Sequence, residues 1–129
     1  MTAIRGLLSR TLLDHSVPRG LRAFVTGFDV KHAFEMGWHE LRNGDLLAAA
    51  EQAGFAIVIT ANKNIRYEQS RAGRRIAIVQ LSTNHWPTLE RHGARVLEAL
   101  QGISVGAFIE VAMPRPMLRR RPPPVAGNG

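Results

Sequence analysis

The 129-residue sequence contains no cysteine, which excludes a disulfide-stabilised scaffold, a zinc site built from thiolates and a cysteine nucleophile. It also lacks an apolar run of the ~18 residues that a membrane-spanning helix needs, so we expect a soluble protein with no membrane partner. No signal-peptide core is present, and we expect a cytoplasmic location. Neither a Gly-x-Gly-x-x-Gly pattern after a strand nor a Gly-Lys-Ser/Thr loop occurs, which argues against dinucleotide and P-loop sites.

Positive charge is in excess, but it is unevenly distributed. The chain carries 17 Lys and Arg against 10 Asp and Glu, a formal net charge of +7. Every acid but only 11 of the basic residues lie within residues 11–111, so this span is nearly neutral. Because most of the excess belongs to the ends of the chain, the net charge alone is weak support for a nucleic-acid partner.

Composition divides the chain into three parts. Residues 112–129 hold five of the seven prolines and the run Arg119-Arg120-Arg121, so we expect a disordered basic tail that solubilises the protein or, less favoured, tethers nucleic acid. Residues 1–10 contain two arginines and no acid, and we expect a short N-terminal extension. Residues 11–111 are long enough for a single domain with a modest core.

Strand and helix patterns alternate along the domain. Strands are predicted over residues 11–13, 28–32, 55–60, 76–81 and 107–111, and helices over residues 17–25, 43–53 and 87–100, with a loop or short helix over residues 62–73. This alternation is typical of an α/β fold with a mostly parallel sheet of about five strands that is covered on both faces. Ligands of such sheets bind beyond the carboxyl ends of the strands, where we expect the functional site.

Polar residues follow three of the predicted strands, beginning with Asp14, Thr60 and Ser82. Asn43 and Asp45 start the second predicted helix and can face the same rim. Carboxylates and amides without thiols suit a hard cation such as Mg²⁺ or Mn²⁺, which could activate a water for phosphodiester cleavage. The competing interpretation is that these residues cap helices and fill turns, with Asn43 as a helix cap. For Asp14 both interpretations remain equally open.

A basic segment follows the third predicted strand. It contains one acid, Glu68, one aromatic residue, Tyr67, and five basic residues: Lys63, Arg66, Arg71, Arg74 and Arg75. Beside a cation site such a segment is suited to hold an RNA backbone, and a tyrosine can stack on a base. The competing interpretation, that this segment is a solvated surface that binds no ligand, is equally favoured.

Histidine and tryptophan give weaker signals. The five histidines lack the i, i+4 spacing of a helical zinc site. His32, His39 and His92 are expected to be structural or exposed. His15 and His85, at strand ends, are less favoured candidates for auxiliary ligands or proton carriers. Trp38 and Trp86 are expected to be packing anchors.

Several of these motifs together resemble the small bacterial PIN-like domain family. The most specific are Leu-Leu-Asp-x-x-x-Pro at residues 12–18 and Thr-x-Asn-Lys at residues 60–63, and the similarity covers about residues 11–111. The resemblance implies a three-layer α/β/α sandwich around a parallel sheet. It also implies kinship with PIN ribonucleases, including toxins of toxin–antitoxin pairs, which cut RNA with Mg²⁺ or Mn²⁺ held by an acidic cluster.

The resemblance assigns roles to four residues. Asp14 matches the first metal-binding acid, and Asp45 falls where the family places an acid at a helix start. Asn62 stands where the family usually has aspartate, and Asn43 where many relatives have it. An amide can coordinate a cation through its carbonyl oxygen but brings no charge, which weakens divalent-ion binding and water activation.

Two functional hypotheses follow. The leading one, which the retained Asp14–Asp45 pair favours, is a metal-dependent ribonuclease acting on single-stranded RNA. Its catalytic and metal-binding residues would be Asp14, Asp45 and Asn62, with Asn43 as a further ligand. An antitoxin protein would be its partner if it is a toxin, and a homodimer is open because PIN relatives often dimerise. The second, which Asn62 favours, is a catalytically weak or inactive PIN-like module that binds RNA or a protein partner.

Overall fold

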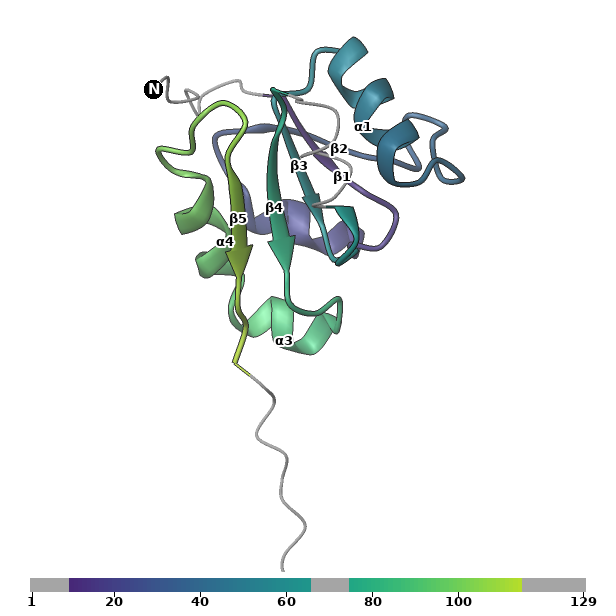
Figure 1. The fold of residues 1–129 in the computed structure, drawn as a ribbon. Coiled ribbons are helices and arrows are strands. Elements are labelled where there is room, and N and C mark those ends of the chain that lie inside the picture. Colours follow the sequence, from purple (N-terminus) through teal and green to yellow (C-terminus); the bar gives the residue numbers. More distant parts are fainter. Residues whose placement is uncertain (1–9, 66–74, 115–129) are drawn as a thin grey trace, which may run out of the picture.

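The computed structural model describes residues 10–65 and 75–114 (Figure 1). They form an α/β fold with a five-stranded, all-parallel sheet in the order β2-β1-β3-β4-β5, accompanied by four helices within the described ranges. The elements in chain order are β1 (Arg10–Leu13), η1 (Arg19–Phe24), β2 (Asp29–His32), α1 (Asn43–Gln52), β3 (Ile57–Thr60), β4 (Ala77–Leu81), α3 (Trp86–Arg91), α4 (Gly93–Leu100) and β5 (Phe108–Val111). The predicted parallel sheet of five strands is confirmed. Residues 1–9 of the expected N-terminal extension and the basic tail beyond residue 114 lie outside the described residues, whereas Arg10, the last residue of that expected extension, begins β1.

Burial along the strands follows their position in the sheet. β3 and β4 lie between other strands and are buried along their whole length, which fits their uncharged, β-branched sequences. β2 forms one edge, pairing through Arg10↔Asp29 to Leu13↔His32, and exposes Asp29 and Lys31. The carboxyl ends of all five strands therefore meet at one rim of the sheet.

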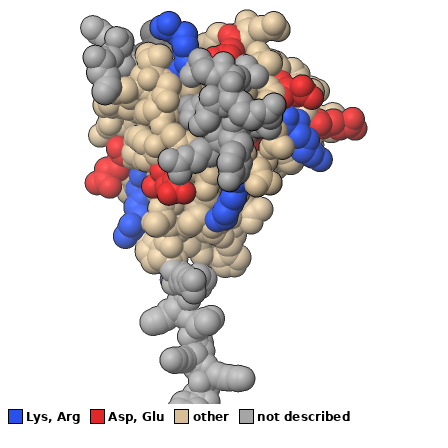
Figure 2. All heavy atoms as spheres, viewed as in Figure 1, with Lys and Arg blue, Asp and Glu red and all other residues tan. Residues whose placement is uncertain are grey.

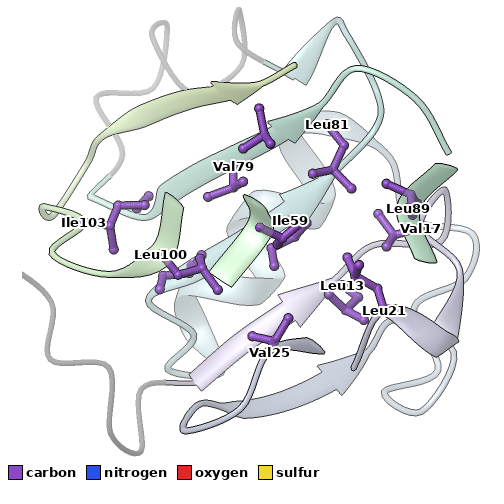
Figure 3. Packing of buried hydrophobic residues seen from close by; sticks show 14 of the residues in the cluster. Leu13, Val17, Leu21, Val25, Ile59, Val79, Leu81, Leu89, Leu100 and Ile103 are labelled. Atoms are coloured by element: carbon purple, nitrogen blue, oxygen red, sulfur yellow. The ribbon is translucent and has the colours of Figure 1, made fainter. Parts of the chain in front are cut away.

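Apolar side chains cover both faces of the sheet because successive strand residues point to opposite sides. One cluster joins Leu13, Ile59 and Val79 to side chains from η1, α3 and α4, and these residues pack toward one another in Figure 3. The other cluster joins Leu12, Val58 and Ile78 to buried residues of α1. Trp86 and Trp38 pack against the first and second clusters respectively, which confirms their prediction as anchors.

Two predicted helices differ from the observed ones. The helix expected over residues 17–25 is the 3₁₀-helix η1, which follows an extended Pro18. The helix expected over residues 87–100 is two helices separated at His92 (φ −119°), so the prediction of one continuous helix is wrong. At this break Gly93 lies against the ring of Phe24 so closely that an added Cβ would sit 2.3 Å from Cγ of the phenylalanine. Contact between α4 and η1 thus requires a residue without a side chain at the break.

The described surface has no overall charge of one sign. Nine of the 17 basic residues and nine of the 10 acids belong to the described ranges, and on the face in Figure 2 the two signs are interspersed. None of the described helices is long and apolar enough to cross a membrane. Any preference for an anionic partner within this part of the chain must therefore come from local arrangement.

Candidate functional site

The strand order places a topological switch point between β1 and β3. From β1 the chain continues to its neighbour β2 on one side, whereas from β3 it continues to β4 on the other. The segments that follow these two strands therefore diverge, and this is where doubly wound sheets bind ligands. Asp14 and Ser16 follow β1 at this point, and Asn62 follows β3.

Asp14 is buried at the switch point, with 1% of its surface exposed. Its Oδ1 accepts hydrogen bonds from the backbone N–H of Ser16 (2.9 Å) and from the Ser16 hydroxyl (2.5 Å), and its Oδ2 accepts one from the Thr60 hydroxyl. The two hydroxyls in turn accept hydrogen bonds from the backbone N–H groups of Ala61 and Asn62, each at 3.0 Å. We call Asp14, Ser16 and Thr60 the Asp14 network.

The Asp14 network joins the segments that follow β1 and β3. Hydrogen bonds to a charged group contribute roughly 1.5–3 kcal/mol each, and they offset the cost of burying the carboxylate. Within the described residues no basic side chain forms an ion pair with Asp14, so these donors carry its stabilisation. The geometry is that of a structural tie between two loops.

Asn62 and Asn43 meet beside this network. Asn62 donates from Nδ2 to Oδ1 of Asn43 (2.6 Å), and its own Oδ1 accepts from the backbone N–H of Asn64 (2.9 Å). Asn43 is the first residue of α1 with φ +43°, a conformation that asparagine tolerates better than most residues. The prediction that Asn43 caps α1 is wrong: Arg42 is at the cap position, and the Asn43 side chain bridges to Asn62 instead.

Asp45 is placed differently from Asp14. It is exposed in the first turn of α1, and its carboxylate has no hydrogen bond or ion pair to any residue of the described ranges. The described ranges also contain no group of three or more His, Asp or Glu side chains that could hold a metal ion. With the Asp14 oxygens and both amide oxygens engaged in internal hydrogen bonds, this arrangement does not present the charged oxygen ligands that Mg²⁺ or Mn²⁺ prefers.

Arg42 and His15 form a pair next to the rim. Nη1 of Arg42 donates to Nε2 of His15 (2.9 Å) and to the carbonyl oxygen of His39 (3.5 Å). Because arginine is always a donor, Nε2 of His15 accepts and the ring proton sits on Nδ1. That Nδ1 is buried and has no hydrogen-bond partner among the residues described. A buried N–H group without an acceptor is rare in folded proteins.

Lys63 lies on the other side of the rim. Its Nζ donates to the backbone carbonyl of Ser82 (3.0 Å), which connects the ends of β3 and β4, and the side chain remains exposed. The other residues predicted to bind nucleic acid, Arg66, Arg71 and Arg74, lie outside the described residues. Among the described residues of the predicted basic segment, Lys63 lies at this rim, whereas Arg75 precedes β4 at the opposite end of that strand.

A ring stack lies beside the Arg42–His15 pair, and sequence reasoning missed it. Phe34 is 46% exposed, and the rings of His32 and His39 stack on it with centroids 5.3 and 5.4 Å away. The guanidinium of Arg19 lies 5.0 Å from the Phe34 centroid. The sequence offers one signal for this feature, a phenylalanine between charged and histidine residues just after a strand. We call Arg19, Phe34 and His39 the aromatic corner.

An open pocket of about 280 Å³ connects the corner to the switch point. Its lining includes His15, Ser16, Arg19, Phe34 and Asn84. Ser16 of the Asp14 network thus lines the same pocket as the aromatic ring of Phe34 and the cationic side chain of Arg19.

Comparison of the chain with protein-family models, with curated proteins and with solved structures finds no match.

Proposed function

We propose that the chain is a PIN-like module, an α/β/α sandwich in three layers, that binds RNA at the carboxyl rim of its sheet. The observation that carries the proposal is the Asn43–Asn62 bridge in place of paired carboxylates, with Arg42 on one side and Lys63 on the other. Amides and cations suit phosphate and sugar oxygens, whereas a divalent cation needs negative charge. In this proposal Asp14 is a positioning residue that holds the two loops bearing the rim.

RNA binding is tested by fluorescence anisotropy with a labelled single-stranded RNA oligonucleotide. We expect binding that weakens as salt rises, because phosphate contacts release counterions. Arg42→Ala and Lys63→Ala should each weaken binding severalfold and reduce the salt dependence by about one phosphate contact. Arg75→Ala is the charge-matched control, since Arg75 is exposed and precedes β4, at the amino end of the strands. Equal losses in all three variants would reduce the effect to net charge and contradict the proposal.

Metal-dependent ribonuclease activity is the second candidate, and one observation favours it. Asp14, Asn62 and Asn43 belong to one connected set of hydrogen bonds at the switch point, where a catalytic site of this fold class is expected. Cleavage would require Ser16 or Thr60 to release an Asp14 oxygen toward Mg²⁺ or Mn²⁺. An antitoxin partner and a homodimer belong to this candidate.

Asp45→Asn is the most informative variant for the second candidate. The carboxylate of Asp45 is exposed and forms no hydrogen bond or ion pair within the described part, so its substitution should leave the fold intact. Mn²⁺ titration by calorimetry and a single-stranded RNA cleavage assay are run on wild type and on this variant. Mn²⁺-dependent cleavage that disappears in Asp45→Asn would establish the ribonuclease, and RNA binding without Mn²⁺ uptake would support the binding module.

A further inference from the structure

The aromatic corner is an unusual surface for this protein. Large apolar side chains are exposed at only two described positions, Phe34 (46%) and Val105 (38%). Val105 precedes β5. Phe34, in contrast, stacks with the rings of His32 and His39 and has the guanidinium of Arg19 near its ring. An exposed aromatic residue with cationic neighbours has the chemistry that stacks on nucleobases.

The stack leads outward from the core. His32 is buried (1% exposed): its Nδ1 accepts from the backbone N–H of Phe34 (3.2 Å), so Nε2 carries the proton and donates to the carbonyl oxygen of Val17 (2.7 Å). Phe34 is nearly parallel to His32 (13°), and the exposed His39 is nearly parallel to Phe34 (5°). One fixed ring therefore orients two exposed ones.

Consecutive turns hold the segment that carries Phe34 and His39. The backbone N–H of Ala33 donates to Leu13 in β1 (2.8 Å), and that of Trp38 donates back to Ala33 (2.9 Å). Gly37 lies between them at φ +75°, a conformation that a side chain disfavours. Trp38 packs edge-on against Phe55 at 6.0 Å in the second apolar cluster. The rings are thus organised before any ligand arrives, which lowers the entropic cost of binding.

Positive charge at the corner is not neutralised by the protein. Within the described ranges Arg19 and Arg42 have no acidic partner, in contrast to Arg22, which pairs with Glu35. The buried Nδ1–H of His15 lies in the same region, since His15, Arg19 and Phe34 line one pocket. The corner therefore combines exposed rings with two guanidinium groups that have no acidic partner in the described ranges.

We propose that the aromatic corner binds an unpaired base of single-stranded RNA. The base extends the stack on Phe34 and His39, and Arg19 and Arg42 hold the adjoining phosphates. This inference rests on the proposed RNA-binding function and specifies which RNA is bound. A duplex keeps its base faces inside the stack, so it lacks the group that this surface fits.

Anisotropy titrations with three probes of equal length test the inference: an unstructured single-stranded RNA, the corresponding RNA duplex and an abasic single strand. Wild type is compared with Phe34→Ala, with Phe34→Trp, which keeps an aromatic face, and with Val105→Ala, the matched loss of an exposed apolar side chain. We expect Phe34→Ala to weaken binding of the single strand about tenfold, because one stacked base contributes about that much. Phe34→Trp should retain wild-type binding, and Val105→Ala should be unchanged.

The abasic strand separates stacking from charge. Wild type should bind it about as weakly as Phe34→Ala binds the normal strand, and Phe34→Ala should cause no further loss on it. If wild type binds RNA but Phe34→Ala is neutral, or if the abasic strand or the duplex binds as well as the single strand, the stacking inference is overturned while the proposed function stands. If wild type binds none of the probes, both are overturned.

Discussion

The Asp14 network and the aromatic corner are neighbours at the carboxyl rim, yet their side chains are used in opposite ways. Asp14 is almost completely buried and both of its oxygens accept hydrogen bonds from within the chain. At the corner Phe34 is exposed, and His15 retains a buried donor with no partner in the described residues. Aspartate is a common catalytic and metal-binding residue, yet here Asp14 is used to stabilise the fold. Phe34, which is not such a residue, keeps an exposed surface on which a ligand can bind.

The largest loss of stability is expected when the carboxylate of Asp14 is removed. Asp14→Ala leaves the buried Thr60 hydroxyl and the half-buried Ser16 donors without their acceptor, so we expect the free energy of unfolding to fall by on the order of 3 kcal/mol. Urea denaturation followed by circular dichroism measures it. Asp45→Ala, an exposed aspartate, should change stability by less than about 0.5 kcal/mol. Similar small losses in both variants would mean that the network does not tie the loops together.

A smaller loss is expected from Thr60→Val, which keeps the volume but removes the hydroxyl. The change deletes a donor to Asp14 and the acceptor for the backbone N–H of Asn62. We expect a destabilisation of about 1–3 kcal/mol by thermal or urea unfolding. Thr26→Val, at an exposed threonine, is the control and should be close to neutral. A neutral Thr60→Val would show that water or another group replaces the hydroxyl at no cost.

The corner should show the reverse pattern. Because Phe34 is 46% exposed, Phe34→Ala should lower the free energy of unfolding by less than about 1 kcal/mol while RNA binding falls about tenfold. Unfolding and anisotropy are measured on the same preparation. A loss of stability comparable to that of Asp14→Ala would erase the distinction between the two regions.

The smallest effect concerns Glu35, which supports the segment bearing the corner. The backbone N–H of His32 (2.8 Å) and then Arg22 lower the pKa of Glu35 from 4.5. A lowered folded-state pKa adds stability above the unfolded value, and this stability is lost as pH falls through the folded one. Glu35→Gln should therefore cost a few tenths of a kcal/mol at neutral pH, because the group is largely exposed, and nothing at a pH well below 4.5. Thermal unfolding of wild type and Glu35→Gln at the two pH values measures this cost. A difference in stability that is the same at both pH values would contradict the prediction.

Much of the rim was predictable from local sequence, because strands and the polar residues after them are neighbours in the chain. Asp14 directly follows β1 and Asn62 closely follows β3, so a parallel sheet brings both to one rim. The role of Asp14 as a hydrogen-bond acceptor inside the fold was not predictable. Its partner Thr60 lies 46 residues away, and an aspartate is equally suited to cap a helix, bind a metal ion or accept internal hydrogen bonds. Asn43 was assigned to capping for the same reason, although its partner Asn62 is 19 residues distant.

The sequence by itself determined the α/β class, the parallel sheet and the rim where the polar residues gather. Hydrophobic periodicity and turn residues involve only a few consecutive positions, so short stretches of sequence are enough to predict these features. Tertiary packing is what separates α3 from α4 at His92, places Gly93 against Phe24 and brings Arg19 and His39 to Phe34. Such contacts depend on distances of a few ångströms between segments that are separate in the sequence, and no local pattern specifies those distances.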